Sequence, residues 1–118
     1  MEIDLTFELY NVYMTELNHE EAFEVIVDRA KEELGDSLKN LFLYGSVAAG
    51  NHSRGSDLDV FAVVEDFEDK RWLEKTAAEI GVEYGVLVSA IVKTEVEYKD
   101  MQNSSFAEEV RETGKAYV

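Results

Sequence analysis

Two aspartates one residue apart lie inside an apolar strand pattern, and no other feature of this chain constrains its fold as strongly. The stretch LYGSVAAGNHSRGSDLDVFAVV runs from residue 43 to residue 64. Its apolar start is too short for a helix and stops at Gly45, and its apolar end, residues 58–64, is typical of a second buried strand. Asp57 and Asp59 therefore fall at the start of a core strand, where unpaired charge is unfavourable.

The spacing of the two aspartates predicts a divalent metal site. Side chains alternate between the faces of a strand, so Asp57 and Asp59 point to the same side, about 6.5 Å apart at about 3.3 Å per residue. Two like charges need positive charge between them, and a pair of divalent cations about 3.5 to 4 Å apart fits that span. We expect Mg²⁺, because it binds one or two carboxylates and completes its shell with water and phosphate oxygens.

The segment between the two strands is typical of a phosphate-binding turn. Gly45 lets the backbone approach a ligand, and Ser46 opens a short turn over residues 47–49 whose free amides suit an anion. Arg54 lies in the following loop, where it either contacts a phosphate or is simply solvated. The stretch is not a Walker loop, because no lysine follows its second glycine.

Composition limits the classes of protein that this chain can belong to. At 118 residues we expect a single domain over 1–118, with residues 1–17 as an N-terminal extension. No apolar run is long enough for a membrane span and no signal peptide is visible, so we expect a soluble cytoplasmic protein. Cysteine is absent, which excludes disulfides and thiolate metal sites. The 26 acidic and 11 basic residues give a net charge of -15, which disfavours a long nucleic-acid partner.

Apolar periodicity predicts alternating helices and strands. We expect helices from about residue 7 to 17, over 18–34 with an Asn18–Glu21 capping box, and before Gly81. Strands are expected over 41–44, 58–64 and 84–92, followed by two short helices capped at Thr94 and Ser105 and a tail over 115–118 that extends along a sheet edge. Such a pattern indicates an α/β (α+β) fold, a sheet covered by helices, with the strand order left open.

The central stretch resembles a known signature. Gly45–Ser46, ten intervening residues and Asp57–Asp59 are similar to the glycine-serine to Asp-x-Asp motif of the DNA polymerase beta-like nucleotidyltransferase superfamily. Gly50 and Ser56 stand where that superfamily has a glycine and a serine. The chain's size resembles the minimal nucleotidyltransferases, single-domain proteins often encoded beside HEPN-domain partners, some of which act as antitoxins that transfer AMP to the partner.

The resemblance implies a mixed sheet with helices behind it and a reaction at the α-phosphate of a nucleoside triphosphate, expected to be ATP, with release of pyrophosphate. Asp57 and Asp59 would coordinate two Mg²⁺ ions. The phosphate-binding residues would be Gly45, Ser46, Arg54 and Ser56. The acceptor would be a hydroxyl of a protein or small molecule, and the partners a HEPN protein or a second copy of the chain, in a homodimer or hetero-oligomer.

One departure from the family pattern concerns a third acid. Active members carry it on a later strand, yet the middle of the strand expected over 84–92 holds Leu87, Val88, Ser89 and Ala90. Glu83 shares a face with Ser89 but lies about 20 Å away at about 3.3 Å per residue. Three alternatives follow. The base that removes the acceptor's proton comes from Glu83 through a different strand register, or it comes from the partner or substrate, or the protein is a weak or inactive enzyme that still binds nucleotide.

Two rival functions remain open. The chain could be a nucleotide-binding interaction module that occludes a HEPN partner without chemistry. It could also be a transferase acting on a small molecule such as an aminoglycoside, although 118 residues leave little room for an acceptor pocket unless a dimer or second protein supplies it.

His52 is either a contact to the nucleotide or exposed, and His19 belongs to the first turn of a helix. The two histidines lack the spacing of metal ligands. Tyr10, Tyr13 and Tyr44 belong to the core and its rim or to a partner surface.

Overall fold

The computed structural model describes residues 18–53 and 55–118. These residues form α2 (His19–Leu34), η1 (Gly35–Ser37), β1 (Leu38–Tyr44), α3 (Gly45–Ala49), β2 (Leu58–Val64), α4 (Phe67–Tyr84), β3 (Val88–Thr94), α5 (Glu95–Met101), α6 (Ser105–Thr113) and β4 (Lys115–Ala116). The helix expected over residues 7–17 lies outside the described residues. Among those described, no helix combines the length and apolar character needed to cross a bilayer.

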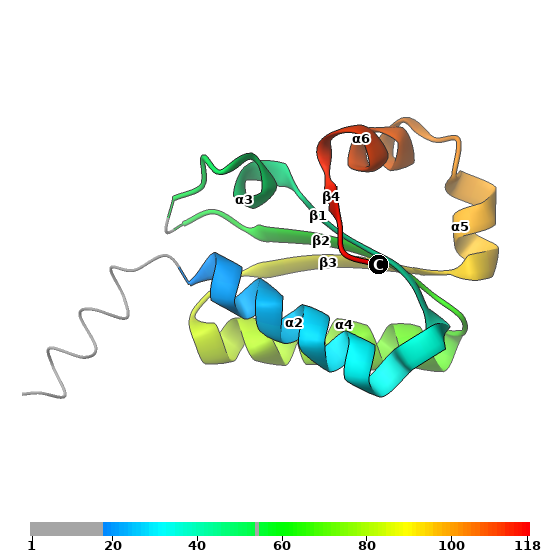
Figure 1. The fold of residues 1–118 in the computed structure, drawn as a ribbon, viewed down its shortest axis with the longest axis horizontal. Helices are drawn as coiled ribbons and strands as arrows, with labels where there is room; N and C mark the ends of the chain where they lie inside the picture. The colour runs from blue at the N-terminus through cyan, green and yellow to red at the C-terminus, as the bar shows by residue number, and fades with distance from the viewer. Residues whose placement is uncertain (1–17, 54) are drawn as a thin grey trace, which may run out of the picture.

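The strands form one mixed sheet in the order β3-β2-β1-β4 (Figure 1). Strand β1 pairs antiparallel with both β2 and β4, whereas β2 pairs parallel with β3. The C-terminal tail continues along the β1 edge, where the Tyr117 amide donates to the Leu41 carbonyl over 2.7 Å. The predictions of a mixed sheet and of a tail along an edge are therefore confirmed.

Helices α2 and α4 cover one face of the sheet, and α5 and α6 lie on the other side (Figure 1). Strand β2 serves both faces because its side chains alternate. The β2 residues in the core under α2 and α4 are Leu58, Val60, Ala62 and Val64. Phe61 and Val63 instead pack with Val110 of α6. Asp59 has the phase of Phe61, so it belongs to the second face.

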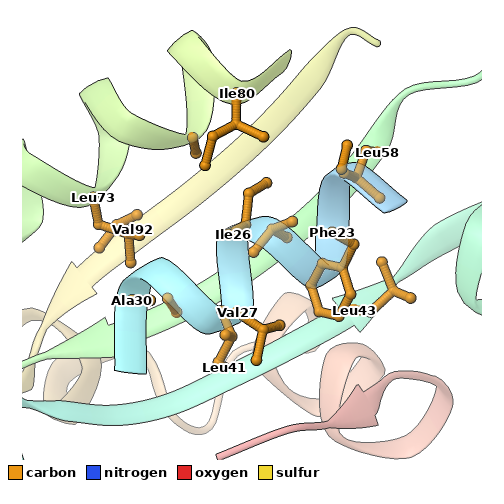
Figure 2. Packing of buried hydrophobic residues seen from close by; sticks show 14 of the residues in the cluster. Phe23, Ile26, Val27, Ala30, Leu41, Leu43, Leu58, Leu73, Ile80 and Val92 are labelled. Carbon is orange, nitrogen blue, oxygen red and sulfur yellow. The ribbon is translucent and has the colours of Figure 1, made fainter. Parts of the chain in front are cut away.

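The larger core holds α2 and α4 against the sheet. Figure 2 shows the apolar stripe of α2 lying over β1 and β2, with α4 beside it. The labelled core residues are Phe23, Ile26, Val27, Ala30, Leu41, Leu43, Leu58, Leu73, Ile80 and Val92. Burial of these side chains is the main stabilising contribution, at about 25 cal/mol per Å² of apolar surface.

The bounds of β1, α4 and β3 differ from the sequence predictions. Strand β1 begins at Leu38, three residues before the expected start at 41. Helix α4 passes through Gly81 and ends at Tyr84, where Gly85 adopts a left-handed conformation with φ 68°. Strand β3 consequently begins at Val88, and the expected strand start at residue 84 is wrong. Gly81 serves packing and does not end the helix, because it is buried and a side chain would not fit there.

Capping explains where the short helices begin. Thr94 and Glu97 form the expected capping box, with Thr94 Oγ1 accepting from the Glu97 amide over 3.2 Å. The second cap is Ser104, which accepts from the Ala107 amide, so the prediction of Ser105 is wrong by one residue. The Asn18 side chain does not cap α2, and its Nδ2 donates to the Tyr84 carbonyl over 3.3 Å instead.

We predict that Gly81→Ala lowers the free energy of unfolding by about 1–3 kcal/mol through overpacking. A Cβ at this position would lie 2.6 Å from the Val86 carbonyl oxygen and 2.8 Å from Val88 Cγ2. Chemical denaturation measures the effect. The control Glu74→Ala, on the exposed side of the same helix, should change stability by less than about 0.5 kcal/mol. Equal effects of the two variants would contradict this account of α4.

Candidate functional site

The end of β1 and the start of β2 meet at a contact between Gly45 and Asp59. Tyr44, the last residue of β1, pairs with Asp59 in the antiparallel ladder. Gly45 follows with φ 76°, and a Cβ built there would meet Asp59 Oδ2 and lie 3.1 Å from Asp59 Cγ. Only glycine therefore fits, for its backbone conformation and for the space that the carboxylate occupies.

The two aspartates lie close enough to influence one another. Asp57 is exposed just before β2, and Asp59 is half-buried on the strand. Burial raises the pKa of the Asp59 carboxyl above its ordinary value of 3.8, and the negative charge of Asp57 raises it further. The structure thus brings together the two carboxylates that the sequence placed on one side of a strand.

This donor set fits a divalent cation. The ion pairs among the described residues are Lys70–Glu97 and Lys75–Glu79, so no described cation pairs with Asp57 or Asp59. Two carboxylates without a cationic partner, one of them partly desolvated, match the oxygen ligands that Mg²⁺ prefers. No third Asp, Glu, His or Cys among residues 18–53 and 55–118 completes a metal-binding group with them.

Ser46 lies in the first turn of α3, directly after Gly45. The first amides of a helix have no partner within it, and those of α3 follow the glycine that touches Asp59. At the other end, the Gly50 amide donates to the Ser46 and Val47 carbonyls, and Gly50 itself adopts φ 76°. The turn is therefore a compact unit whose N-terminal end faces the aspartate strand.

Ser56 organises the loop before the aspartates. Its Oγ accepts from the Ser53 amide over 2.9 Å, and its carbonyl oxygen accepts from His19 Nε2 over 2.7 Å. Its expected phosphate contact stays a prediction. Arg54, the other loop residue expected to bind phosphate, lies outside the described residues.

The two histidines meet in space. His19 is in the first turn of α2, as expected, and is 1% exposed. Its ring lies edge-on to that of His52, with 4.9 Å between centroids. From the sequence we expected only that the two histidines lack the spacing of metal ligands, and nothing in it indicated that the start of α2 packs on the loop before β2.

No acid of β3 lies beside the aspartates. Ser89 pairs with Asp59 in the parallel β2–β3 ladder, so the residue of β3 beside this aspartate is a serine. Glu83 belongs to α4, so no register of β3 can bring it to Asp59. The hypothesis that Glu83 supplies the base through a different register is therefore wrong.

Tyr44 lies beside Asp59, although from the sequence we expected it only in the core and its rim or on a partner surface. Its register places it on the side of Asp59 opposite Ser89, and its ring packs edge-on against Phe106 at 5.7 Å. Burial, then the charges of Asp59 and Glu109, raises the pKa of the Tyr44 hydroxyl to about 12. At neutral pH the phenol is a neutral hydrogen-bond donor beside the carboxylate. Alternation along β1 could have revealed this position had the β1–β2 register been known.

A separate cavity of about 410 Å³ does not include the aspartates. Its lining residues are Glu20, Phe23, Glu24, Val27, Asp28, Leu43, Val47, Lys115 and Tyr117. Leu43 points to the face opposite Asp59, because adjacent strand residues alternate. Three carboxylates against one lysine disfavour a phosphate there, so this cavity is not the nucleotide site.

We predict that Gly45→Ala is more destabilising than Gly50→Ala, measured as the free energy of unfolding. Both glycines have φ 76°, but nothing lies within 4 Å of a Cβ at Gly50, so this control isolates backbone strain. The added clash with Asp59 should contribute about 1–3 kcal/mol more. Equal losses of unfolding free energy in the two variants would show that a side chain at position 45 does not clash with the Asp59 carboxylate.

We also predict that Asp59→Asn stabilises the protein in EDTA at neutral pH, raising Tm by a few degrees. Folding raises the pKa of the Asp59 carboxyl above its ordinary value of 3.8. The stability linked to this group is therefore fully present when the pH is below that ordinary pKa, and it falls as the pH rises through the higher pKa of the folded state. The gain from Asn should therefore vanish below that ordinary value. Thermal melts across pH measure it, and a variant less stable than wild type at neutral pH would contradict the burial of this charge.

Comparison with known proteins places this geometry in a family. The nucleotidyltransferase domain family matches residues 24–113. Two proteins of Methanocaldococcus jannaschii, each named "putative protein adenylyltransferase", are 30% and 31% identical over 100 residues. These matches cover 84% and 80% of this chain and 97% and 96% of the relatives.

Solved structures share the fold. A toxin-antitoxin crystal structure with AMP-PNP aligns with a TM-score of 0.53 at 18% identity, over 79% of this chain and 70% of the other. A mutant of the toxin-antitoxin MntA-HpeT aligns with a TM-score of 0.52 at 16% identity, over 85% and 72%. With the family match over residues 24–113 and relatives at 30% identity, the chain belongs to the nucleotidyltransferase domain family, as its glycine-serine and aspartate motif predicted.

Proposed function

We propose that this nucleotidyltransferase transfers AMP from ATP to a hydroxyl group of a protein. The observation that carries the proposal is the contact between Gly45 and Asp59, which joins the start of a short helix to a pair of carboxylates that have no cationic partner among residues 18–53 and 55–118. Phosphate and metal sites side by side are what a nucleoside triphosphate requires. The names of the two relatives support AMP as the transferred group and a protein as the acceptor.

Asp57 and Asp59 are the proposed metal ligands. Bound Mg²⁺, two ions in our proposal, would neutralise the charge of the triphosphate and polarise its α-phosphate. The chain's own part is to hold two carboxylates in place and to keep Asp59 partly desolvated, which strengthens its attraction for a cation. The neutral Tyr44 hydroxyl beside Asp59 adds a donor without adding charge.

The phosphates are proposed to lie at the start of α3. Amides near Gly45 and Ser46 would donate to phosphate oxygens, since they have no helical partners. Arg54 and Ser56 are proposed to contact the same phosphates from the loop. Most of the rate enhancement would come from positioning and charge neutralisation, because phosphoryl-type transfer needs little covalent chemistry from the protein.

The proposed reaction forms one bond and breaks one. The acceptor oxygen attacks the α-phosphorus, the bond from that phosphorus to the bridging oxygen of the β-phosphate breaks, and pyrophosphate leaves with the electron pair. The acceptor's proton must be removed. With Ser89 beside Asp59 and Glu83 on α4, we propose that the base comes from the acceptor protein or from solvent.

The partner is proposed to be a HEPN-domain protein, with this chain as the antitoxin. Support comes from the folds that align with it, which are named as toxin-antitoxin structures. The net charge of -15 favours a protein acceptor over a long nucleic acid. We further propose that the chain acts in the cytoplasm, as one domain over 1–118 with residues 1–17 as an extension.

A second candidate function is nucleotide-dependent binding of the partner without chemistry. The observation that favours it is Ser89, which stands beside Asp59 where active members of the superfamily carry a third acid. Transfer of AMP distinguishes the two, because only the enzyme adds mass to its partner.

We predict that incubation with Mg-ATP and the product of the neighbouring gene adds an AMP-sized mass to that partner. Intact-mass spectrometry measures the increment. Asp57→Asn and Asp59→Asn should each lower the rate about 10²-fold or more, because the charge that neutralises the transition state is lost. Glu74→Asn, an equal loss of charge on exposed α4, is the control and should leave the rate unchanged. A stable complex without added mass would leave the binding function in place of the transferase.

A further inference from the structure

Asp57 lies between two residues whose backbone is hydrogen-bonded to other elements of the fold. It precedes β2, and its exposed side chain has no hydrogen bond or ion pair among the described residues. The position of its carboxylate beside Asp59 therefore depends on how the backbone is fixed at residues 56 and 58.

Two hydrogen bonds join that backbone to other parts of the fold, in addition to the local bond from the Ser56 amide to the Ser53 carbonyl over 3.0 Å. On one side, the Leu58 amide donates to the Leu87 carbonyl over 2.8 Å, at the start of the β2–β3 ladder. On the other side, His19 Nε2 donates to the Ser56 carbonyl over 2.7 Å. The first bond belongs to the sheet. The second comes from a helix that starts 37 residues earlier in the chain.

The surroundings of His19 make this second bond well defined. The imidazole is 1% exposed, and the adjacent Asn18 ties the start of α2 to the end of α4 through the Tyr84 carbonyl. His52 packs edge-on against the same ring. Because a carbonyl only accepts, Nε2 carries the proton, and Nδ1 is left buried without a partner among the described residues.

An unsatisfied buried nitrogen needs an explanation. A leucine would fill the space without it, so packing alone does not account for a histidine at position 19. We infer that His19 is a positioning residue for the nucleotidyl transfer site. Its hydrogen bond to the Ser56 carbonyl holds Asp57 beside Asp59, so that both carboxylates can bind one metal cluster. The metal-binding part of this inference rests on the proposed function.

Three substitutions separate the hydrogen bond from packing. The amide nitrogen of His19→Gln can stand near the place of Nε2 and donate to Ser56, whereas His19→Asn reaches only to the place of Nδ1 and His19→Leu donates nothing. Binding of Mn²⁺ with a non-hydrolysable ATP analogue is measured by electron paramagnetic resonance. We expect the dissociation constant of Mn²⁺ to rise about 10–100-fold in His19→Leu and His19→Asn, as for other residues that orient metal ligands, and to stay near wild type in His19→Gln.

The control is Ile26→Ala, a buried core change on the same helix. It should lower Tm and leave Mn²⁺ binding unchanged, which excludes general loss of stability as the cause. The inference is overturned if folded His19→Leu and His19→Asn bind Mn²⁺ as wild type does, or if His19→Gln binds Mn²⁺ as weakly as His19→Leu.

A second readout needs no metal. Amide hydrogen exchange in EDTA should quicken at Ser56 and Leu58 in His19→Leu and His19→Asn, and stay at the wild-type rate in His19→Gln. If wild type binds no Mn²⁺, the proposed function fails, and these exchange rates alone decide the positioning role. Unchanged exchange at both amides in His19→Leu would overturn it.

Discussion

The contact between the Gly45 backbone and the Asp59 carboxylate is the constraint on which the site depends. It exists because β1 and β2 are antiparallel neighbours with Tyr44 opposite Asp59, so the turn after β1 must pass the carboxylate at the start of β2. A side chain at position 45 would occupy the space of that carboxylate. Gly45 therefore couples the two halves of the site, the helix-start amides and the acidic pair, within one hairpin-like unit.

The same arrangement places the negative charge of Asp59 where it is unfavourable, and a bound cation would offset that charge. Partial burial of Asp59 and the nearby charge of Asp57 both disfavour the ionised carboxylate, as the raised pKa of Asp59 indicates. A partly buried negative charge opposes folding, and a divalent cation reduces that penalty when it binds. The hydrophobic core between α2, α4 and the sheet offsets this destabilising contribution of the Asp59 charge.

The sequence predicted most of the fold because its apolar patterns were strong. Residues 58–64 were expected as a strand and form one, and the α2 stripe ended at Gly35 as expected. Prediction was wrong where tertiary packing overrode a local signal, as at Gly81, which is buried inside α4 and does not end it. In the candidate site, chain spacing sufficed to predict that Asp57 and Asp59 lie together, since they are two residues apart. It could not predict that His19 and Tyr44 lie nearby, because their places depend on how α2 packs against the loop before β2 and how β1 pairs with β2.

We propose above all that the two aspartates form a metal site that serves a nucleotide at the start of α3. Calorimetric titration of the protein with a non-hydrolysable ATP analogue, in Mg²⁺ and in EDTA, tests it most directly. We expect binding that depends on Mg²⁺, at least about tenfold tighter than in EDTA, which corresponds to 1.4 kcal/mol or more. Equal affinity in the two buffers would contradict the claim.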